Sequence, residues 1–142
     1  MTQGKNVRTR RRTLIQHWQA VVRKIIWRSD ISPSAWIAET ALIDRTWPKG
    51  IHIGAGAVIG EEAVVLSHDL TRGLYLDTRI GERTIIGPRA MILPGISVGA
   101  DCIVAAGALV NRDMPDGSKA IGNPATITAG ADSSEQSRHD GA

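Results

Sequence analysis

A six-residue period of branched aliphatic residues runs through most of this chain and constrains its fold more than any other feature. Neither the 3.6-residue period of an α-helix nor the two-residue alternation of an ordinary strand produces this spacing. Each of these aliphatic residues is commonly followed directly by Gly, and a small or β-branched residue often stands four positions after it. The twelve residues in period are Ile31, Ile37 and Ile43, then Ile53, Ile59 and Val65, then Ile80, Ile86, Ile92, Val98, Val104 and Val110.

A repeat of six residues is typical of a parallel β-helix, in which each repeat forms a short strand and a turn, and successive coils stack their aliphatics in a column. Each buried Ile or Val contributes about 1.5–3 kcal/mol, so one coil is unstable alone and the array must fold as a single stack. The chain has no Phe, and all four Trp lie before residue 48, which suits a narrow aliphatic core. The sequence therefore predicts an all-β domain, a parallel β-helix over residues 31–127. The period alone does not give the hand of the coil.

The N-terminal segment 1–30 is basic and is predicted to contain a short amphipathic helix. Residues 1–28 carry eight of the seventeen Lys and Arg and no acidic residue, so they hold a charge of +8 against −5 for the rest of the chain. From Leu14 to Ile26, apolar residues recur at helical spacing. We expect this helix to cover the open end of the β-helix or to pack between subunits, with peripheral membrane contact as the alternative. Residues 128–142, rich in Ser, Asp and Gly, are predicted to be a disordered tail.

Cysteine content and hydrophobicity indicate where the protein works. The single Cys102 excludes an internal disulfide and a cysteine-based zinc site. No stretch approaches the ~20 apolar residues of a transmembrane helix, and no signal-peptide core follows the basic start. We expect a soluble cytoplasmic protein whose basic segment is a solvated face and not a nucleic-acid site.

Two breaks interrupt the period, a short one at Thr46–His52 and a longer one from Ser67 to Arg79. Breaks in a solenoid correspond to surface loops, often on the binding face. The longer break contains His68, which could act as a base beside the coils. On the residues alone, a His in a loop is more commonly a solvated side chain.

Three local motifs add to the repeat. The motifs are Ser67-His68-Asp69, the run Ile92 to Gly99 followed by Ala105-Ala106-Gly107-Ala108, and Gly122-Asn123-Pro124-Ala125. With these motifs, the chain from Ile31 to about Ile127 resembles the hexapeptide-repeat acyltransferases, and in particular the sugar O-acetyltransferases of the maltose, galactoside, nodulation-factor and exopolysaccharide group. The resemblance implies left-handed coils and a homotrimer with active sites between subunits.

The resemblance implies an enzyme of polysaccharide biosynthesis that moves an acetyl group from acetyl-CoA to a hydroxyl of a sugar or saccharide precursor, with His68 as general base. A general base of this kind typically raises the rate of the chemical step by about 10²–10⁴-fold. The CoA thiol has a pKa of about 8–9, so no strong general acid is needed, and no metal is required. Matched positions place Ala106 beside CoA, and Asn111 and Arg112 at its pantetheine or phosphate end, where the fork of donors on Arg suits phosphate.

Several positions depart from the resemblance. Ile85 stands where many relatives have Trp, and Thr126 where a basic residue is common. Pro88 occupies a turn whose backbone N–H serves the acyl site in relatives, and proline has no such donor. The oxyanion donor therefore stays open, as does the group that orients His68, for which Asp69 and Asp77 are the acids in the same loop.

Other functions stay open on the sequence. N-acetylation of an amino sugar needs the same base, and a non-catalytic scaffold could keep the fold. A γ-type carbonic anhydrase is disfavoured because His52 and His68 are the only His within the repeats, whereas that enzyme binds zinc through three. A serine acetyltransferase is disfavoured because those enzymes carry a long helical N-terminal domain, and only residues 1–30 precede the first coil here.

Overall fold

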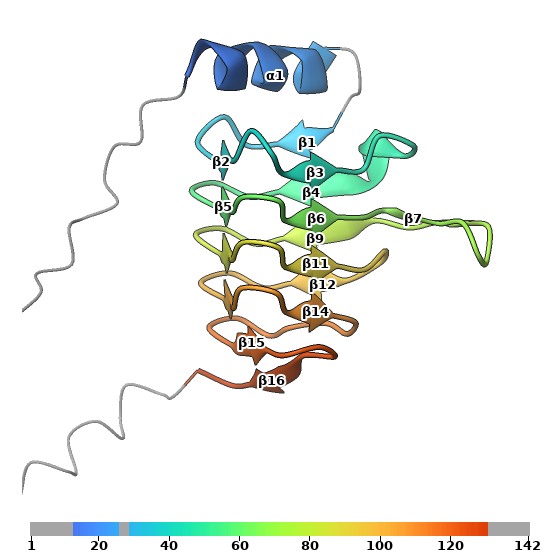
Figure 1. Cartoon of the computed structure of the whole chain (residues 1–142), viewed down its shortest axis with the longest axis vertical. Helices are drawn as coiled ribbons and strands as arrows, with labels where there is room; N and C mark the ends of the chain where they lie inside the picture. The colour runs from blue at the N-terminus through green and yellow to red at the C-terminus, as the bar shows by residue number, and fades with distance from the viewer. Residues whose placement is uncertain (1–12, 26–28, 131–142) are drawn as a thin grey trace, which may run out of the picture.

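The computed structural model describes residues 13–25 and 29–130. Short strands stack in successive coils to form a left-handed parallel β-helix, and a single helix lies across its N-terminal end (Figure 1). The predicted fold is confirmed. Three parallel sheets form three flat faces of the stack, which we call faces A, B and C.

Each face is built from strands of successive coils. Face A contains β1 (Asp30–Ile31), β4 (Ile51–Ile53), β9 (Thr78–Ile80) and β12 (Ser97–Val98). Face B contains β2 (Trp36–Ile37), β5 (Val58–Ile59), β10 (Ile85–Ile86), β13 (Ile103–Val104), β15 (Lys119–Ile121) and, antiparallel at the end, β16 (Thr126–Thr128). Face C contains β3 (Leu42–Ile43), β6 (Val64–Val65), β11 (Met91–Ile92) and β14 (Leu109–Val110).

The periodic aliphatics form the interior, as predicted. In face B, for example, Ile59 and Val104 are both in register with Ile86 of the coil between them. Eleven of the twelve periodic residues are buried, and Ile31 of the first coil is partly buried. The small residues four positions later fill the corners of the triangular core, most of them also buried.

The glycine that follows many of these aliphatics permits close stacking of the coils. A Cβ added to Gly87 would lie 2.7 Å from the backbone N of Ala106 and 2.7 Å from the carbonyl oxygen of Val104. Contacts this short with backbone atoms cannot be relieved by rotating a side chain. The glycine is therefore required where the chain turns the corner against the next coil.

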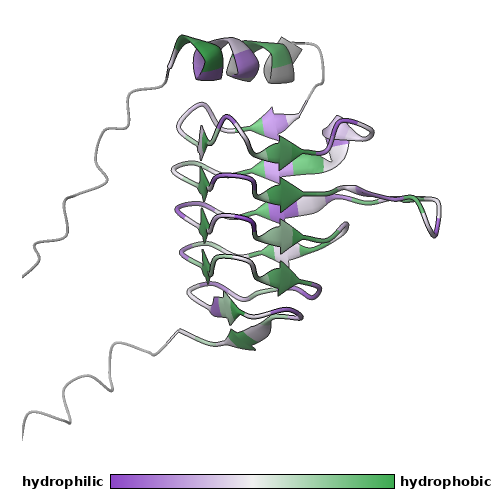
Figure 2. Cartoon of the chain, viewed as in Figure 1, coloured by the Kyte–Doolittle hydropathy of each residue, from purple (hydrophilic) through white to green (hydrophobic). Residues whose placement is uncertain are grey.

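The outward-facing side chains differ between the three faces. On face A they are mostly polar, whereas those of faces B and C are mostly apolar, and Figure 2 shows the same contrast along the strands. The outer row is Asp30, His52, Arg79 and Ser97 on face A, Trp36, Val58, Ile85, Ile103 and Lys119 on face B, and Leu42, Val64, Met91 and Leu109 on face C.

The N-terminal helix α1 (Leu14–Ile25) matches the predicted helix, whose last residue, Ile26, lies outside the described residues. It contacts the first coil, where Gln16 Nε2 donates to the carbonyl oxygen of Ile37 at 3.4 Å. No helix in the described part of the chain is long and apolar enough to cross a membrane. Of the segments predicted to be tails, residues 1–12 and 131–142 also lie outside the description.

Candidate active site

The longer break in the repeat is a β-hairpin that projects from the stack (Figure 1). Its strands are β7 (His68–Asp69) and β8 (Leu74–Tyr75), which pair antiparallel. The Asp69 carboxylate holds the turn, since it accepts from the Thr71 backbone N–H at 2.9 Å and hydroxyl at 2.5 Å and from Arg72 Nε at 2.6 Å. These donors, the Thr71 hydroxyl first and then Arg72, hold the pKa of Asp69 well below its usual range. Asp69 therefore shapes the hairpin and does not orient His68.

Buried hydrogen bonds fix the base of the hairpin to the coils. The Ser67 hydroxyl donates to the carbonyl oxygen of Trp47 at 2.6 Å, and the Thr78 hydroxyl donates to that of Leu66 at 2.6 Å. Ser67 and Thr78 are both fully buried. Leu76 N–H closes the hairpin by donating to the carbonyl oxygen of Ser67 at 2.8 Å. His68 thus leaves the stack from a rigid anchor.

His68 is paired with Asp44, a carboxylate from the preceding coil. His68 Nδ1 makes a short hydrogen bond to Asp44 Oδ2, and the same oxygen accepts from the backbone N–H of Ser67 at 2.8 Å and of His68 at 3.0 Å. The other oxygen accepts from the backbone N–H of Thr46 at 2.8 Å and of Trp47 at 3.3 Å. Asp44 is 1% exposed and the His68 side chain 16%. The pair is a buried carboxylate with an imidazole at its outer edge.

The environment keeps Asp44 ionised. Burial alone would raise its pKa, but the Ser67 N–H, the His68 imidazole and the N–H groups of Thr46 and His68 outweigh burial and lower it to about 2. Because the ionised Asp44 carboxylate accepts a hydrogen bond from His68 Nδ1, it favours the tautomer of His68 that carries its hydrogen on Nδ1. The lone pair of Nε2 is then left to accept a proton, which is the arrangement of a general base with its orienting acid.

The two breaks in the repeat meet at this site. The shorter one, which contains the 3₁₀ turn η1 (Pro48–Gly50) and carries Trp47, begins two residues after Asp44. The Trp47 ring lies against the Tyr75 ring with centroids 5.1 Å apart and planes at 53°. Tyr75 is the residue directly opposite His68 in the hairpin. An aromatic pair, with Tyr75 exposed, therefore stands next to the imidazole.

The sequence pointed to His68 but not to Asp44. Neither acid of its own loop orients the imidazole, because Asp69 holds the turn and Asp77 lies 3.4 Å from His52 Nε2. One signal was present: Asp44 directly follows Ile43 and stands just before the shorter break, and Ile43 is in register with Val65, three residues before His68. Counting coils across the break would have placed Asp44 and His68 at the same corner.

The residues predicted to bind CoA lie at two different corners of the stack. Asn111 and Arg112 follow β14 and are exposed at the corner between faces C and A, where Asp44 follows β3 and His68 follows β6. Two strand spacings separate β6 from β14, or roughly 10 Å. Ala106 lies instead at the corner between faces B and C, exposed, and Gly107 N–H beside it donates to the Pro88 carbonyl oxygen at 2.9 Å. One chain thus brings Asn111 and Arg112, but not Ala106, to the corner of His68.

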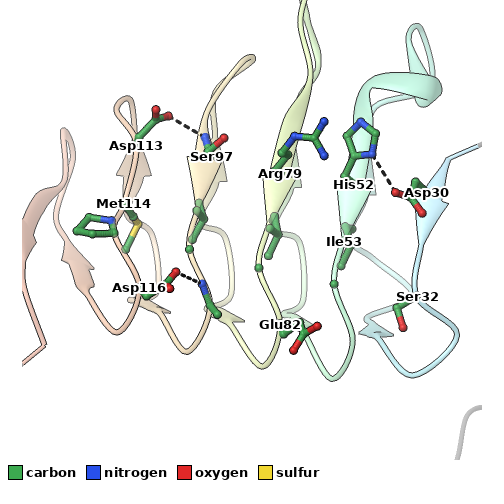
Figure 3. Close-up of a pocket in the computed structure, with 17 residues that line it drawn as sticks. Asp30, Ser32, His52, Ile53, Arg79, Glu82, Ser97, Asp113, Met114 and Asp116 are labelled. Carbon is green, nitrogen blue, oxygen red and sulfur yellow. Dashed lines mark hydrogen bonds and ion pairs between the residues drawn. The ribbon is translucent and has the colours of Figure 1, made fainter.

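A shallow groove of about 820 Å³ runs along face A, away from His68 (Figure 3). His52 lies in it between two carboxylates, with Nδ1 3.1 Å from Asp30 Oδ2 and Nε2 3.4 Å from Asp77 Oδ1. Arg79 follows His52 along the groove and lies 3.8 Å from Asp77. The groove is the polar face of the stack. Across the described residues, no three His, Cys, Asp or Glu side chains are grouped so that they could hold a metal ion.

Known proteins share the repeat and the fold. The family model described as bacterial transferase hexapeptide (six repeats) matches residues 77–112. Over 102 residues the chain is 32% identical to YvoF of Bacillus subtilis (strain 168). The aligned region spans 70% of this chain and 59% of YvoF. The chain is also 40% identical over 103 residues to serine acetyltransferase 2 of Arabidopsis thaliana. The aligned region spans 69% of this chain and 31% of that enzyme.

Among solved structures, a galactoside acetyltransferase in complex with coenzyme A superimposes with a TM-score of 0.65 at 17% identity, over 89% of this chain and 76% of that one. The predicted resemblance to hexapeptide-repeat acyltransferases is confirmed. The chain spans less than two thirds of the length of either sequence relative. Serine acetyltransferase, disfavoured on the sequence, is thus among the relatives of the coils.

Proposed function

We propose that this chain, a hexapeptide-repeat β-helix protein, is an acetyltransferase that uses acetyl-CoA to acetylate a hydroxyl of a sugar or saccharide precursor in the cytoplasm. The observation that carries the proposal is the pair of His68 and Asp44. An imidazole whose Nδ1 is bound by a buried ionised carboxylate, in the main interruption of such a repeat, is arranged to remove a proton from an acceptor.

In the proposed reaction, His68 Nε2 takes the proton of the acceptor hydroxyl while its oxygen attacks the thioester carbonyl carbon of acetyl-CoA. The tetrahedral intermediate collapses, the carbon–sulfur bond breaks, and the CoA thiolate leaves and takes the proton from the imidazolium. Asp44 stabilises that imidazolium through Nδ1. Pro88 has no N–H, so the oxyanion is stabilised by a different donor from the one at this turn in relatives.

The aromatic pair beside the imidazole supports a saccharide acceptor. The C–H faces of a sugar ring pack on aromatic side chains, while the polar end of Tyr stays in water. Tyr75 is exposed and lies across the hairpin from His68, and Trp47 supports it. We therefore place the acceptor over Tyr75, with one hydroxyl directed at Nε2.

The donor site is proposed to lie between subunits of a homotrimer. Asn111 and Arg112 would hold the pantetheine or phosphate end of CoA at the corner of His68, against face B of a neighbouring subunit, while Ala106, at the corner of faces B and C, would lie toward the threefold axis. The distribution of polarity supports this assembly. Three triangular prisms that pack around a threefold axis cover two faces of each subunit and expose the third, and faces B and C are apolar while face A is polar.

The proposed activity is tested by incubating the full chain with acetyl-CoA and a panel of acceptors, and by identifying acetylated products by mass spectrometry. The panel contains neutral sugars, amino sugars and serine, because the acceptors named for relatives are diverse. We expect O-acetylated sugar, and faster release of CoA in its presence. Acetylation of the amino sugars at nitrogen, or of serine, would refute the proposal that a sugar hydroxyl is the acceptor. The absence of product with every acceptor would refute the proposed acetyltransferase activity and favour a non-catalytic scaffold.

A further inference from the structure

The helix α1 presents an apolar stripe to solvent. Leu14, Trp18 and Val21 follow one another at spacings of four and three residues, so they share one side of the helix. These three residues are 90%, 69% and 40% exposed, and Ile15 at the edge of the stripe is 58% exposed. A contiguous row of large apolar side chains on a soluble surface marks a contact site.

The less exposed side of α1 lies toward the β-helix. Gln16, Gln19 and Val22 are less exposed than the stripe, and Gln16 Nε2 donates to the first coil. An open cleft of about 210 Å³ lies between α1 and the first coil, lined by Trp18, Gln19 and Val22 of the helix and by Glu39 and Ala41 of the coil. Within the described part of the chain, Gln19 Oε1 is buried without a hydrogen-bond partner. Gln16 thus anchors the helix to the stack, while Leu14, Ile15 and most of the Trp18 side chain stay exposed to solvent.

We infer that this stripe docks the protein on an anionic lipid surface. The stripe lies within residues 1–28, which carry eight Lys and Arg and no acidic residue, including Arg10, Arg11 and Arg12 just before α1. A helix with Trp and aliphatic residues on one side and a strongly basic surrounding sequence binds in the interfacial plane of a membrane. Trp18 suits this interfacial position, because Trp concentrates at the boundary between lipid and water.

Charge favours lipid over a second copy of the chain as the occupant. Packing stripes of two or three copies together would bring segments of +8 close to one another with no acidic residue among them, which costs free energy. An anionic leaflet instead attracts each segment. In a cyclic assembly all the α1 helices lie at the same end, so several stripes would meet one membrane at once. The docking does not depend on the proposed acetyl transfer.

The test is flotation of the full chain with vesicles of phosphatidylcholine alone and of phosphatidylcholine and phosphatidylglycerol in equal parts. We expect binding to the mixed vesicles that weakens as salt is raised. Trp18→Gln should weaken it about tenfold, because one large apolar side chain leaves the lipid. Replacing Arg10, Arg11 and Arg12 with Gln should weaken it about a hundredfold. Ile121→Gln, at an exposed position at the opposite end of the stack, is the matched control and should bind like wild type.

Each other outcome overturns the inference. Equal binding to both kinds of vesicle would remove the role of anionic lipid. Loss of binding in the arginine variant but not in Trp18→Gln would make the segment a general polyanion site, as for nucleic acid. No vesicle binding, with Trp18→Gln lowering the oligomeric state in sedimentation, would make the stripe an interface between copies. Acetyl transfer to a soluble acceptor is measured alongside, and we expect Trp18→Gln to leave it unchanged.

Discussion

Asp44→Asn is the substitution that should separate the chemistry of this site from its packing. The carboxylate accepts five hydrogen bonds, three at Oδ2 and two at Oδ1, in a buried position. The Asn side chain has one oxygen and one NH₂ group in place of the two carboxylate oxygens. Its NH₂ must therefore face either the three donors of Ser67 and His68 or, in a second orientation, the N–H groups of Thr46 and Trp47. The second orientation costs less because it leaves two donors unpaired instead of three. In it, His68 keeps a neutral acceptor and loses the charge that stabilises the imidazolium.

The magnitude follows from the lost bonds and from the lost charge. Two N–H groups left without acceptors beside the buried carboxylate cost about 2–6 kcal/mol of the free energy of unfolding, at 1–3 kcal/mol each. The lowering of the Asp44 pKa from 3.8 to about 2 corresponds independently to roughly 2 kcal/mol at neutral pH. The rate constant kcat should fall by up to the 10²–10⁴-fold that a general base supplies.

The assay measures release of the CoA thiol at saturating substrates, with urea unfolding to follow stability. Asp77→Asn is the matched control, because Asp77 also lies against a His but is 59% exposed on its side chain. We expect the control to keep wild-type kcat and stability to within about 0.5 kcal/mol. If Asp44→Asn kept wild-type kcat although the protein remained folded, the assignment of Asp44 as the orienting acid would be wrong.

Three further predictions follow from the same structure. Because the pKa of Asp44 is lowered, its stabilising effect is complete above about pH 4 and is lost as pH falls through about 2, so the stability gap between wild type and Asp44→Asn should close over that range; a constant gap would refute this. Ile86→Ala in the core should cost about 2–5 kcal/mol in urea unfolding, whereas Ile121→Ala at an exposed position should cost about 1 or less, and equal costs would argue against the aliphatic column. Ile85→Glu on apolar face B should shift sedimentation equilibrium from trimer to smaller species while Arg79→Glu on face A should not, and a monomeric wild type would end the trimer proposal.

The sequence predicted the coils well because their cause is local and repeated. Each periodic Ile or Val, such as Ile86, meets the same residue type in the coils on both sides, so one pattern accounts for eleven buried positions. The position of the projecting loop was also predictable, since residues that leave the period must leave the stack.

The partners of the site residues were harder to predict, because contacts between coils depend on the length of each break. Asp44 and His68 are 24 residues apart, with one break between them, and only the register of Ile43 with Val65 brings them together. The amphipathic pattern of α1 likewise predicted a helix but not its orientation. The apolar stripe that would be expected to cover the core faces outward, because Gln16 and Thr13 anchor the other side to the first coil.

The measurement that tests the central claim most directly is single-turnover transfer of the acetyl group from acetyl-CoA to an accepted sugar by wild type and by His68→Gln. Gln is close in size to His and can donate to Asp44, but it cannot take a proton. The account predicts a fall in the transfer rate of about 10²–10⁴-fold with an unchanged Kd for CoA and unchanged stability in urea. A His68→Gln variant that transfers acetyl groups as fast as wild type would contradict the account.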